Sequence, residues 1–209
     1  MTQTALFWDK ISKKYAAKPV ADEEAYQKKL AMTQAYLTHE SKVLEFACGT
    51  GSTALVHAPL VSSYTAIDIS PKMVEICKNK LSDTEIHNLE FKVATLDDYR
   101  QFENEYDVIL GLSILHLLSN YKEVIAQTFK MLKPGGIFVS NTGCLSDHMA
   151  YMRFILPLMK LLGLAPHVEF FSRKELEQSM LSSGFIIEKA WLPPKSKTSY
   201  FVIARKPES

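Results

Sequence analysis

The chain has 209 residues, with 24 Lys or Arg and 23 Asp or Glu, so its formal net charge is +1. This length suits one domain with a full core, and 47% apolar and 22% charged residues exclude a disordered chain. The near-neutral charge disfavours a nucleic-acid partner, and three cysteines without a C-x-x-C pair disfavour a disulfide framework or a cysteine zinc site.

The first forty residues are expected to form two helices. Apolar residues recur at helical spacing between residues 6 and 15, and Pro19 ends that segment. A second helix is expected to follow Asp22, an N-cap candidate, and to run to about Leu37. Residues 1–9 hold no basic region followed by an apolar run, so we expect no signal peptide and a cytoplasmic location.

From residue 42 the pattern alternates between strands and helices. A helix is expected to begin at Ser70 and Pro71, which suit the cap and first turn, and residues 133–136 are expected to close another helix as a turn. Strands are expected at residues 43–46, 64–69, 89–94, 106–111 and 137–141, and further helices at 52–58 and 121–132. Strands separated by helices predict a doubly wound, mostly parallel α/β sheet.

After residue 141 this alternation ends. An apolar helix is expected over residues 149–164, and a capped helix is expected to run from Ser172 to Gly184. Two strands, at residues 185–191 and 200–204, are expected to form a hairpin. The hairpin predicts one antiparallel strand at or near the edge of the sheet.

A glycine turn follows the first strand of the sheet. Gly49 and Gly51 allow a tight turn and close approach of a ligand to the backbone, and residues 49–54 fit the dinucleotide template G-x-G-x-x-G/A. Asp68 ends the next strand, where a carboxylate can accept hydrogen bonds from both ribose hydroxyls. These features leave an NAD(P)-dependent oxidoreductase open. Glu45 argues against it, because a dinucleotide fingerprint has an apolar residue there, and the chain has no Tyr-x-x-x-Lys.

Four segments in the right order resemble the motifs of class I S-adenosylmethionine (SAM)-dependent methyltransferases of the small-molecule type. They are residues 43–52, 66–73, 107–118 and 132–138. The resemblance implies a seven-stranded sheet of order 3-2-1-4-5-7-6 with strand 7 antiparallel and helices on both faces. It also implies methyl transfer from SAM to a small acceptor.

The resemblance and an expected aromatic lid together assign the cofactor contacts. Asp68 is expected to hold the ribose, Met73 to line the adenine, and the Gly111 carbonyl to receive the methionine ammonium. Ala47 stands where the family often has Gly, and Thr95 where many members have Asp. The expected cofactor contacts are Tyr15, Glu45, Phe46, Ala47, Cys48, Gly49, Gly51, Asp68, Ile69, Met73, Thr95, Leu96 and Gly111.

The catalytic residue is less determined than the donor site. Methyl transfer is an in-line displacement, so a base is needed only where the acceptor must lose a proton. His116, after the fourth strand, is the candidate; packing among apolar neighbours is the alternative, and His167 is interpreted as a loop residue. Contacts to the acceptor are expected from His148, Tyr151, Met152 and Arg153.

The apolar stretch is interpreted as a cap over an apolar or amphiphilic acceptor, because a helix that is apolar all round must be buried or cover something apolar. Core packing or a homodimer face is the alternative.

We expect no stable membrane insertion, no nucleic-acid partner and no metal site. A SAM-binding scaffold without catalysis also stays open. The single domain, residues 1–209, is divided into a helical lid (1–40), a SAM-binding core (42–142), a cap insertion (145–170) and a C-terminal helix with hairpin (171–209).

Overall fold

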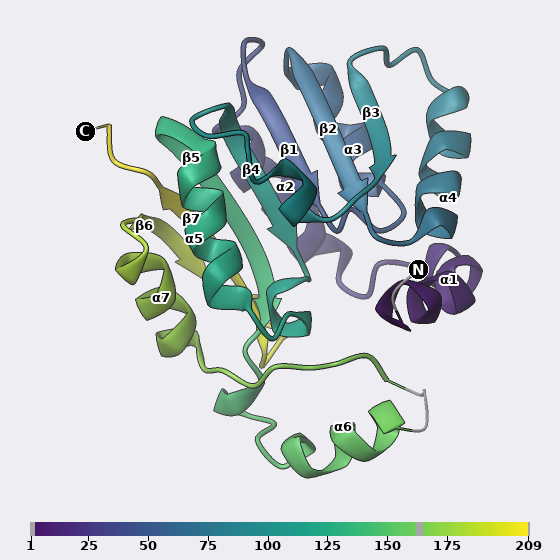
Figure 1. Cartoon of the computed structure of the whole chain (residues 1–209), viewed down its shortest axis with the longest axis vertical. Helices are drawn as coiled ribbons and strands as arrows, with labels where there is room; N and C mark the ends of the chain where they lie inside the picture. Colours follow the sequence, from purple (N-terminus) through teal and green to yellow (C-terminus); the bar gives the residue numbers. More distant parts are fainter. Residues whose placement is uncertain (1–2, 162–164, 209) are drawn as a thin grey trace.

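The computed structural model describes residues 3–161 and 165–208, which form a seven-stranded sheet with helices on both faces (Figure 1). The strand order is β3-β2-β1-β4-β5-β7-β6, and β7 is antiparallel to both β5 and β6 while the other neighbours are parallel. The predicted order and the antiparallel seventh strand are therefore confirmed. The strands are β1 (Lys42–Phe46), β2 (Ser63–Asp68), β3 (Leu89–Val93), β4 (Tyr106–Leu112), β5 (Leu132–Gly143), β6 (Ile186–Trp191) and β7 (Ser199–Arg205).

Alternating side chains of the strands supply a core on each face of the sheet. Leu44 and Phe138 pack with α5 and α7 on one face. Val43 and Val139 pack with α2, α3 and α4 on the other. The helices are α1 (Gln3–Ala16), α2 (Glu23–Gln34), α3 (Ser52–His57), α4 (Pro71–Ser82), α5 (Tyr121–Met131), α6 (Met152–Leu161) and α7 (Arg173–Ser182).

Side-chain caps begin three of these helices, as their sequences predict. The Asp22 carboxylate accepts a hydrogen bond from a backbone N–H at the start of α2, and Ser70 does the same for α4. Ser172 and Glu175 form a reciprocal capping box at α7. Helix α2 ends at Gln34, earlier than predicted.

The turn predicted over residues 133–136 lies within β5. Leu132 pairs with Tyr106 and Ile137 pairs with Val108, so the register between β4 and β5 shifts across this segment. The strand therefore begins at Leu132, and residues 133–136 bulge out of the ladder of hydrogen bonds. The predicted end of the helix is confirmed, because α5 ends at Met131, but the segment after it belongs to β5 because the pairing with β4 continues on both sides of the bulge.

The apolar stretch predicted over residues 149–164 is helical only from Met152, and residues 162–164 lie outside the described part. Helix α6 contains no buried residue; Phe154 is 84% exposed and Leu161 is 83% exposed. It stands at one end of the molecule, away from the sheet (Figure 1). The alternative that this helix packs in the core is therefore wrong.

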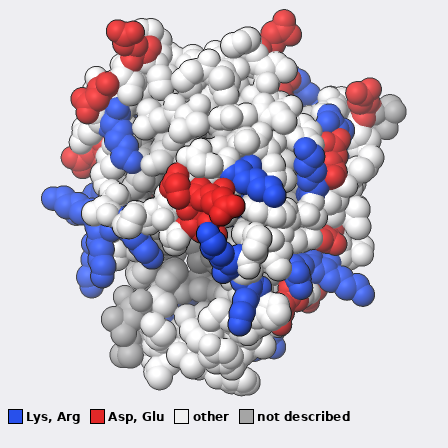
Figure 2. All heavy atoms as spheres, turned by 180° about the vertical axis from the view of Figure 1, so that it is seen from behind, with Lys and Arg blue, Asp and Glu red and all other residues white. Residues whose placement is uncertain are grey.

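The surface mixes acidic and basic side chains. They are interspersed on the face shown in Figure 2, as the small net charge suggests. Among the described residues, no helix combines the length and the apolar character that crossing a membrane requires.

Candidate active site

Strands β1, β2 and β4 end at the same edge of the sheet. Phe46 is opposite Ile67 on one side and Gly111 on the other. In a parallel α/β sheet, ligands bind outside this carboxyl edge. A cavity of about 250 Å3 lies there. It is lined by the predicted residues Tyr15, Phe46, Ala47, Gly49, Asp68, Ile69, Met73, Thr95 and Leu96, among others.

The turn after β1 has three residues in the left-handed region: Ala47 at φ 54°, Gly49 at φ 56° and Gly51 at φ 73°. Because Ala47 has a Cβ, the left-handed conformation is sterically unfavourable there, whereas a glycine would have no such penalty. A Cβ on Gly49 would lie 3.8 Å from the Tyr15 ring, whereas one on Gly51 would lie 2.8 Å from the Phe91 ring. Gly49 therefore borders the cavity. Gly51 packs against the protein interior and does not line the cavity, so its contact with a cofactor stays a prediction.

Asp68 faces this turn from the end of β2. Its Oδ2 accepts a hydrogen bond from the Gly49 N–H at 2.9 Å, and its Oδ1 accepts one from the Ser70 N–H at 2.9 Å. Burial raises the pKa of Asp68, while the bonds from the Ser70 and Gly49 N–H groups oppose that rise. The carboxylate is thereby held between the glycine turn and the start of α4, facing the cavity.

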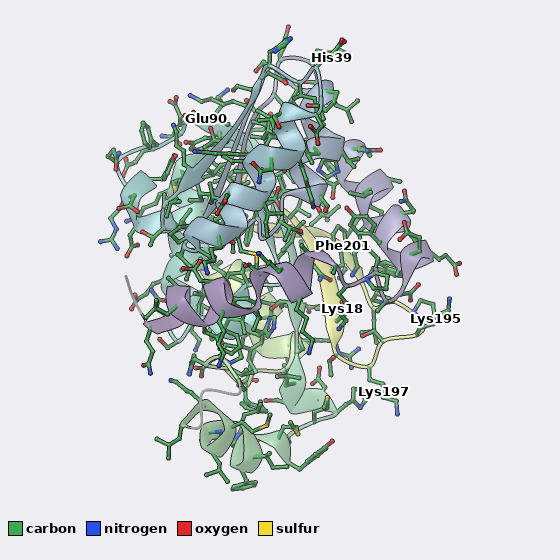
Figure 3. All side chains as sticks on the ribbon, turned by 90° about the vertical axis from the view of Figure 1, so that its right-hand side faces the viewer. Lys18, His39, Glu90, Lys195, Lys197 and Phe201 are labelled. Carbon is green, nitrogen blue, oxygen red and sulfur yellow. The ribbon has the colours of Figure 1, made fainter. Side chains whose placement is uncertain are left out.

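Helix α1 covers the cavity on one side. Its Asp9 carboxylate accepts hydrogen bonds from the Ser70 hydroxyl and the Lys72 N–H, which attach α1 to the start of α4. Trp8 and Tyr15 of α1 line the cavity, and burial followed by the charge of Asp68 raises the pKa of Tyr15. In Figure 3 α1 crosses the molecule between α4 and α6, where the predicted lid would lie.

Glu45 and Cys48, both predicted as cofactor contacts, lie behind the cavity wall. The buried Glu45 carboxylate accepts a hydrogen bond from the Tyr64 hydroxyl at 2.7 Å, and burial raises its pKa to about 7. A hydrogen bond with Cys77 and burial raise the pKa of the Cys48 thiol. Neither residue lines the cavity, and their contact with a cofactor stays a prediction.

The end of β4 differs from the prediction in a similar way. Gly111 is packed on the Phe46 ring, 2.4 Å from where its Cβ would stand, and it does not line the cavity. Ser113 does line it, with φ 59° and its N–H donating to the Asn141 carbonyl at 2.6 Å. Sequence reasoning missed Ser113, because no residue pattern marks a serine in the left-handed region. Such strained positions concentrate at functional sites.

His116, the predicted catalytic residue, is also behind the cavity. Its Nδ1 lies 3.0 Å from the Thr142 hydroxyl and accepts a hydrogen bond from the Gly143 N–H at 3.3 Å. Burial lowers its pKa to about 4, so the ring is neutral at neutral pH. His116 does not line this cavity; its ring is bonded to the end of β5, and its catalytic role stays a prediction.

His167 reaches the cavity instead. Its Nε2 lies 3.1 Å from Glu169 Oε2, and the Glu169 N–H donates to the His116 carbonyl at 2.7 Å. The signal that could have found this pair is the spacing of two residues, which in an extended chain puts both side chains on one side. His167 is a loop residue, as predicted, and it also lines the cavity.

Of the predicted acceptor contacts, Arg153 is placed at a cavity. It lines a second cavity, of about 370 Å3, between α6 and residues 166–170, where its guanidinium carbon lies 5.7 Å from the Phe170 ring centroid. Neither of the two cavities is lined by His148, Tyr151 or Met152. Those three predicted contacts are therefore not brought to the site.

Comparison with known sequences adds to this geometry. Residues 43–136 match the family described as a methyltransferase domain. Demethylmenaquinone methyltransferase of Tropheryma whipplei (strain Twist) is 27% identical over 165 residues, covering 74% of this chain and 66% of that protein. Malonyl-acyl-carrier protein O-methyltransferase of Priestia megaterium is 26% identical over 164 residues, covering 76% and 56%. The matches therefore span less than two thirds of the length of these relatives.

Solved structures share the fold at low sequence identity. The YcgJ protein from Bacillus subtilis has a TM-score of 0.71 and 17% identity, covering 88% of this chain and 100% of that one. Geranyl diphosphate C-methyltransferase from Streptomyces coelicolor, solved with S-adenosyl-L-homocysteine, has a TM-score of 0.71 and 11% identity, covering 88% and 79%.

Proposed function

We propose that this chain, which contains a methyltransferase domain in the class I, Rossmann-like fold, transfers a methyl group from SAM to a small apolar or amphiphilic acceptor. The observation that carries the proposal is the position of Asp68, held by backbone N–H groups against a left-handed glycine turn and facing a cavity.

The donor set of the cavity fits this cofactor. A carboxylate has about four lone-pair directions, and the Gly49 and Ser70 N–H groups each occupy one at Asp68, which leaves it able to accept from a ribose hydroxyl. Ile69 and Met73 supply an apolar wall beside it, suited to a base. Trp8 and Tyr15 supply aromatic rings, suited to a sulfonium cation.

When bound, SAM supplies an activated methyl group. The chain has to orient the acceptor, exclude water and, where the acceptor carries a proton, remove it. We assign that last role to His167. A carboxylate oxygen accepts, so in the tautomer with hydrogen on Nε2 His167 donates to Glu169, and its Nδ1 then has a lone pair that can take a proton.

The names of the relatives support a small acceptor. Several matched relatives are named for demethylmenaquinone, a small molecule, and one is named for malonyl-acyl-carrier protein. The small-molecule name is the more frequent of the two. We therefore favour small-molecule methylation over a macromolecular acceptor.

Calorimetric titration with SAM, S-adenosylhomocysteine and NADH tests the proposal. We expect wild type to bind the two adenosyl ligands and not NADH. Asp68→Ala and Asp68→Asn should lower the affinity at least about tenfold, because hydrogen bonds to a charged group contribute about 1.5–3 kcal/mol each. Asp83→Ala, which alters an exposed aspartate, is the matched control.

Two outcomes would contradict the proposal. Binding of NADH alone would make the glycine turn a dinucleotide site. Binding of SAM without methyl transfer to any acceptor in a cell extract would favour a scaffold without catalysis. Thermal denaturation of both Asp68 variants separates a lost ligand contact from a lost fold.

A further inference from the structure

A second cavity adjoins the first. It lies between α6 and residues 166–170, and Pro166 and His167 line both cavities. The imidazole of His167 is therefore at the junction of the two spaces. A molecule in the second cavity would have one end beside the site that we propose for the cofactor.

The charged groups of this cavity are distributed unevenly. Arg153 and Lys160 come from α6, whereas Glu169 comes from the opposite wall and bonds to His167. Across residues 3–161 and 165–208, neither Arg153 nor Lys160 has an ion pair with a carboxylate. Glu169 already has His167 as a partner, so the two cations have no carboxylate of their own. The α6 side of the cavity therefore favours an anion.

The rest of the lining is apolar. Leu156 and Pro157 of α6 face Val168 and Phe170 of the opposite segment across the cavity. The Arg153 guanidinium lies over the Phe170 ring, a contact that restricts its orientation and needs no counter-ion. An entirely polar anion would leave the apolar walls in contact with water, and a neutral apolar molecule would leave both cations unused.

We propose that the second cavity binds an amphiphilic anion, with its anionic group on Arg153 and Lys160 and its apolar body between α6 and residues 166–170. The opposite end of this molecule would reach His167. The proposal rests on the proposed function, since it identifies the class of acceptor that this site would take.

Calorimetric titration of the full chain with decanoate and with decanol tests the inference, both kept below the concentrations at which they aggregate. The two probes share an apolar chain and differ in the charge of the head group. We expect decanoate to bind at least about tenfold more tightly than decanol, because its carboxylate can form charge-assisted hydrogen bonds with Arg153 and Lys160.

The double variant Arg153→Gln, Lys160→Gln should remove this preference and leave decanol binding unchanged. Lys174→Gln changes an exposed lysine on α7 and is the matched control. Leu156→Ser should weaken both probes, because it shortens the apolar wall that they share. Thermal denaturation verifies that each variant is folded.

Three results would overturn the inference: no binding of decanoate, equal binding of the two probes, or the same loss in Lys174→Gln as in the double variant. S-adenosylhomocysteine binding, measured on the same samples, keeps the two proposals apart. If it is absent from wild type, the proposed function fails; if it is retained while decanoate shows no preference, only this inference fails.

Discussion

The two cavities are built in different ways. The first is formed by strand ends, a glycine turn and a carboxylate that two backbone N–H groups hold, all close to the buried sheet. The second is formed by α6, which has no buried residue, and by a segment attached through the Glu169 N–H to the His116 carbonyl. The first is held in place by hydrogen bonds and by packing against the sheet, whereas the second has few contacts that would keep it in one shape.

This difference is suited to a transferase with one constant donor and a separate acceptor. A site on strand ends holds its groups in place, and a helix with sparse packing can adjust to its ligand.

The packing around the glycine turn should make the stability of the protein sensitive to substitution of Gly51. Gly51→Ala places a Cβ 2.8 Å from the Phe91 ring at a φ of 73°, so we expect a loss of about 3 kcal/mol or more in the free energy of unfolding. Gly49→Ala has similar backbone strain, but its Cβ would lie an ordinary 3.8 Å from the Tyr15 ring. We therefore expect it to lower the free energy of unfolding by only about 1 kcal/mol. Urea denaturation measures both. Equal losses would mean that the packing behind the turn does not matter.

Burial of Glu45, behind the first cavity, makes the stability of the folded protein depend on pH. Its pKa is about 7 in the folded protein against an ordinary 4.5, so the folded state binds more protons between these values and stability falls as the pH rises through that window. The full effect is on the order of 3 kcal/mol. Glu45→Gln should remove this part of the pH dependence, measured by urea denaturation at pH 5 and pH 8. Glu90→Gln, at an exposed strand position, is the control and should behave as wild type.

Whether the catalytic base lies where the two cavities meet is tested by substituting His167 and His116 in turn. With any acceptor that loses a proton, His167→Gln should lower kcat about 100-fold, which is the usual contribution of a general base. His116→Gln should leave kcat within about threefold, because that ring lies behind the cavity. Steady-state kinetics on both variants measure this. The reverse ranking would restore His116 as the catalytic residue.

The exposed face of α6 should show the smallest effect. Phe154→Ser and Leu161→Ser remove apolar side chains that are 84% and 83% exposed, so we expect the free energy of unfolding to change by less than about 0.5 kcal/mol. Leu176→Ser, at a fully buried position of α7, is the contrast and should cost several kcal/mol, about 2–5. A large loss from the α6 variants would show that this helix is packed in solution.

The core of the sheet was predictable from local signals. Strand and helix periods, the caps at Asp22, Ser70 and Ser172, and the glycine turn all act within a few residues of one another. The predicted strand order came from the resemblance to a family, and the pairing confirms it. The segment after residue 141 was less predictable, because the same apolar run is compatible with a buried helix and with an exposed one.

What the sequence determined by itself is part of the first cavity: the glycine turn and Asp68 at the end of the next strand, because strand alternation and left-handed backbone positions are local properties. Only the tertiary structure decided which histidine reaches the cavity. His116 and His167 are 51 positions apart. The hydrogen bonds that place them, from the Gly143 N–H to the His116 ring and from the Glu169 N–H to the His116 carbonyl, join residues far apart in the chain. Contacts of this kind depend on how β5 and residues 166–170 pack together, and no spacing along the sequence encodes that packing.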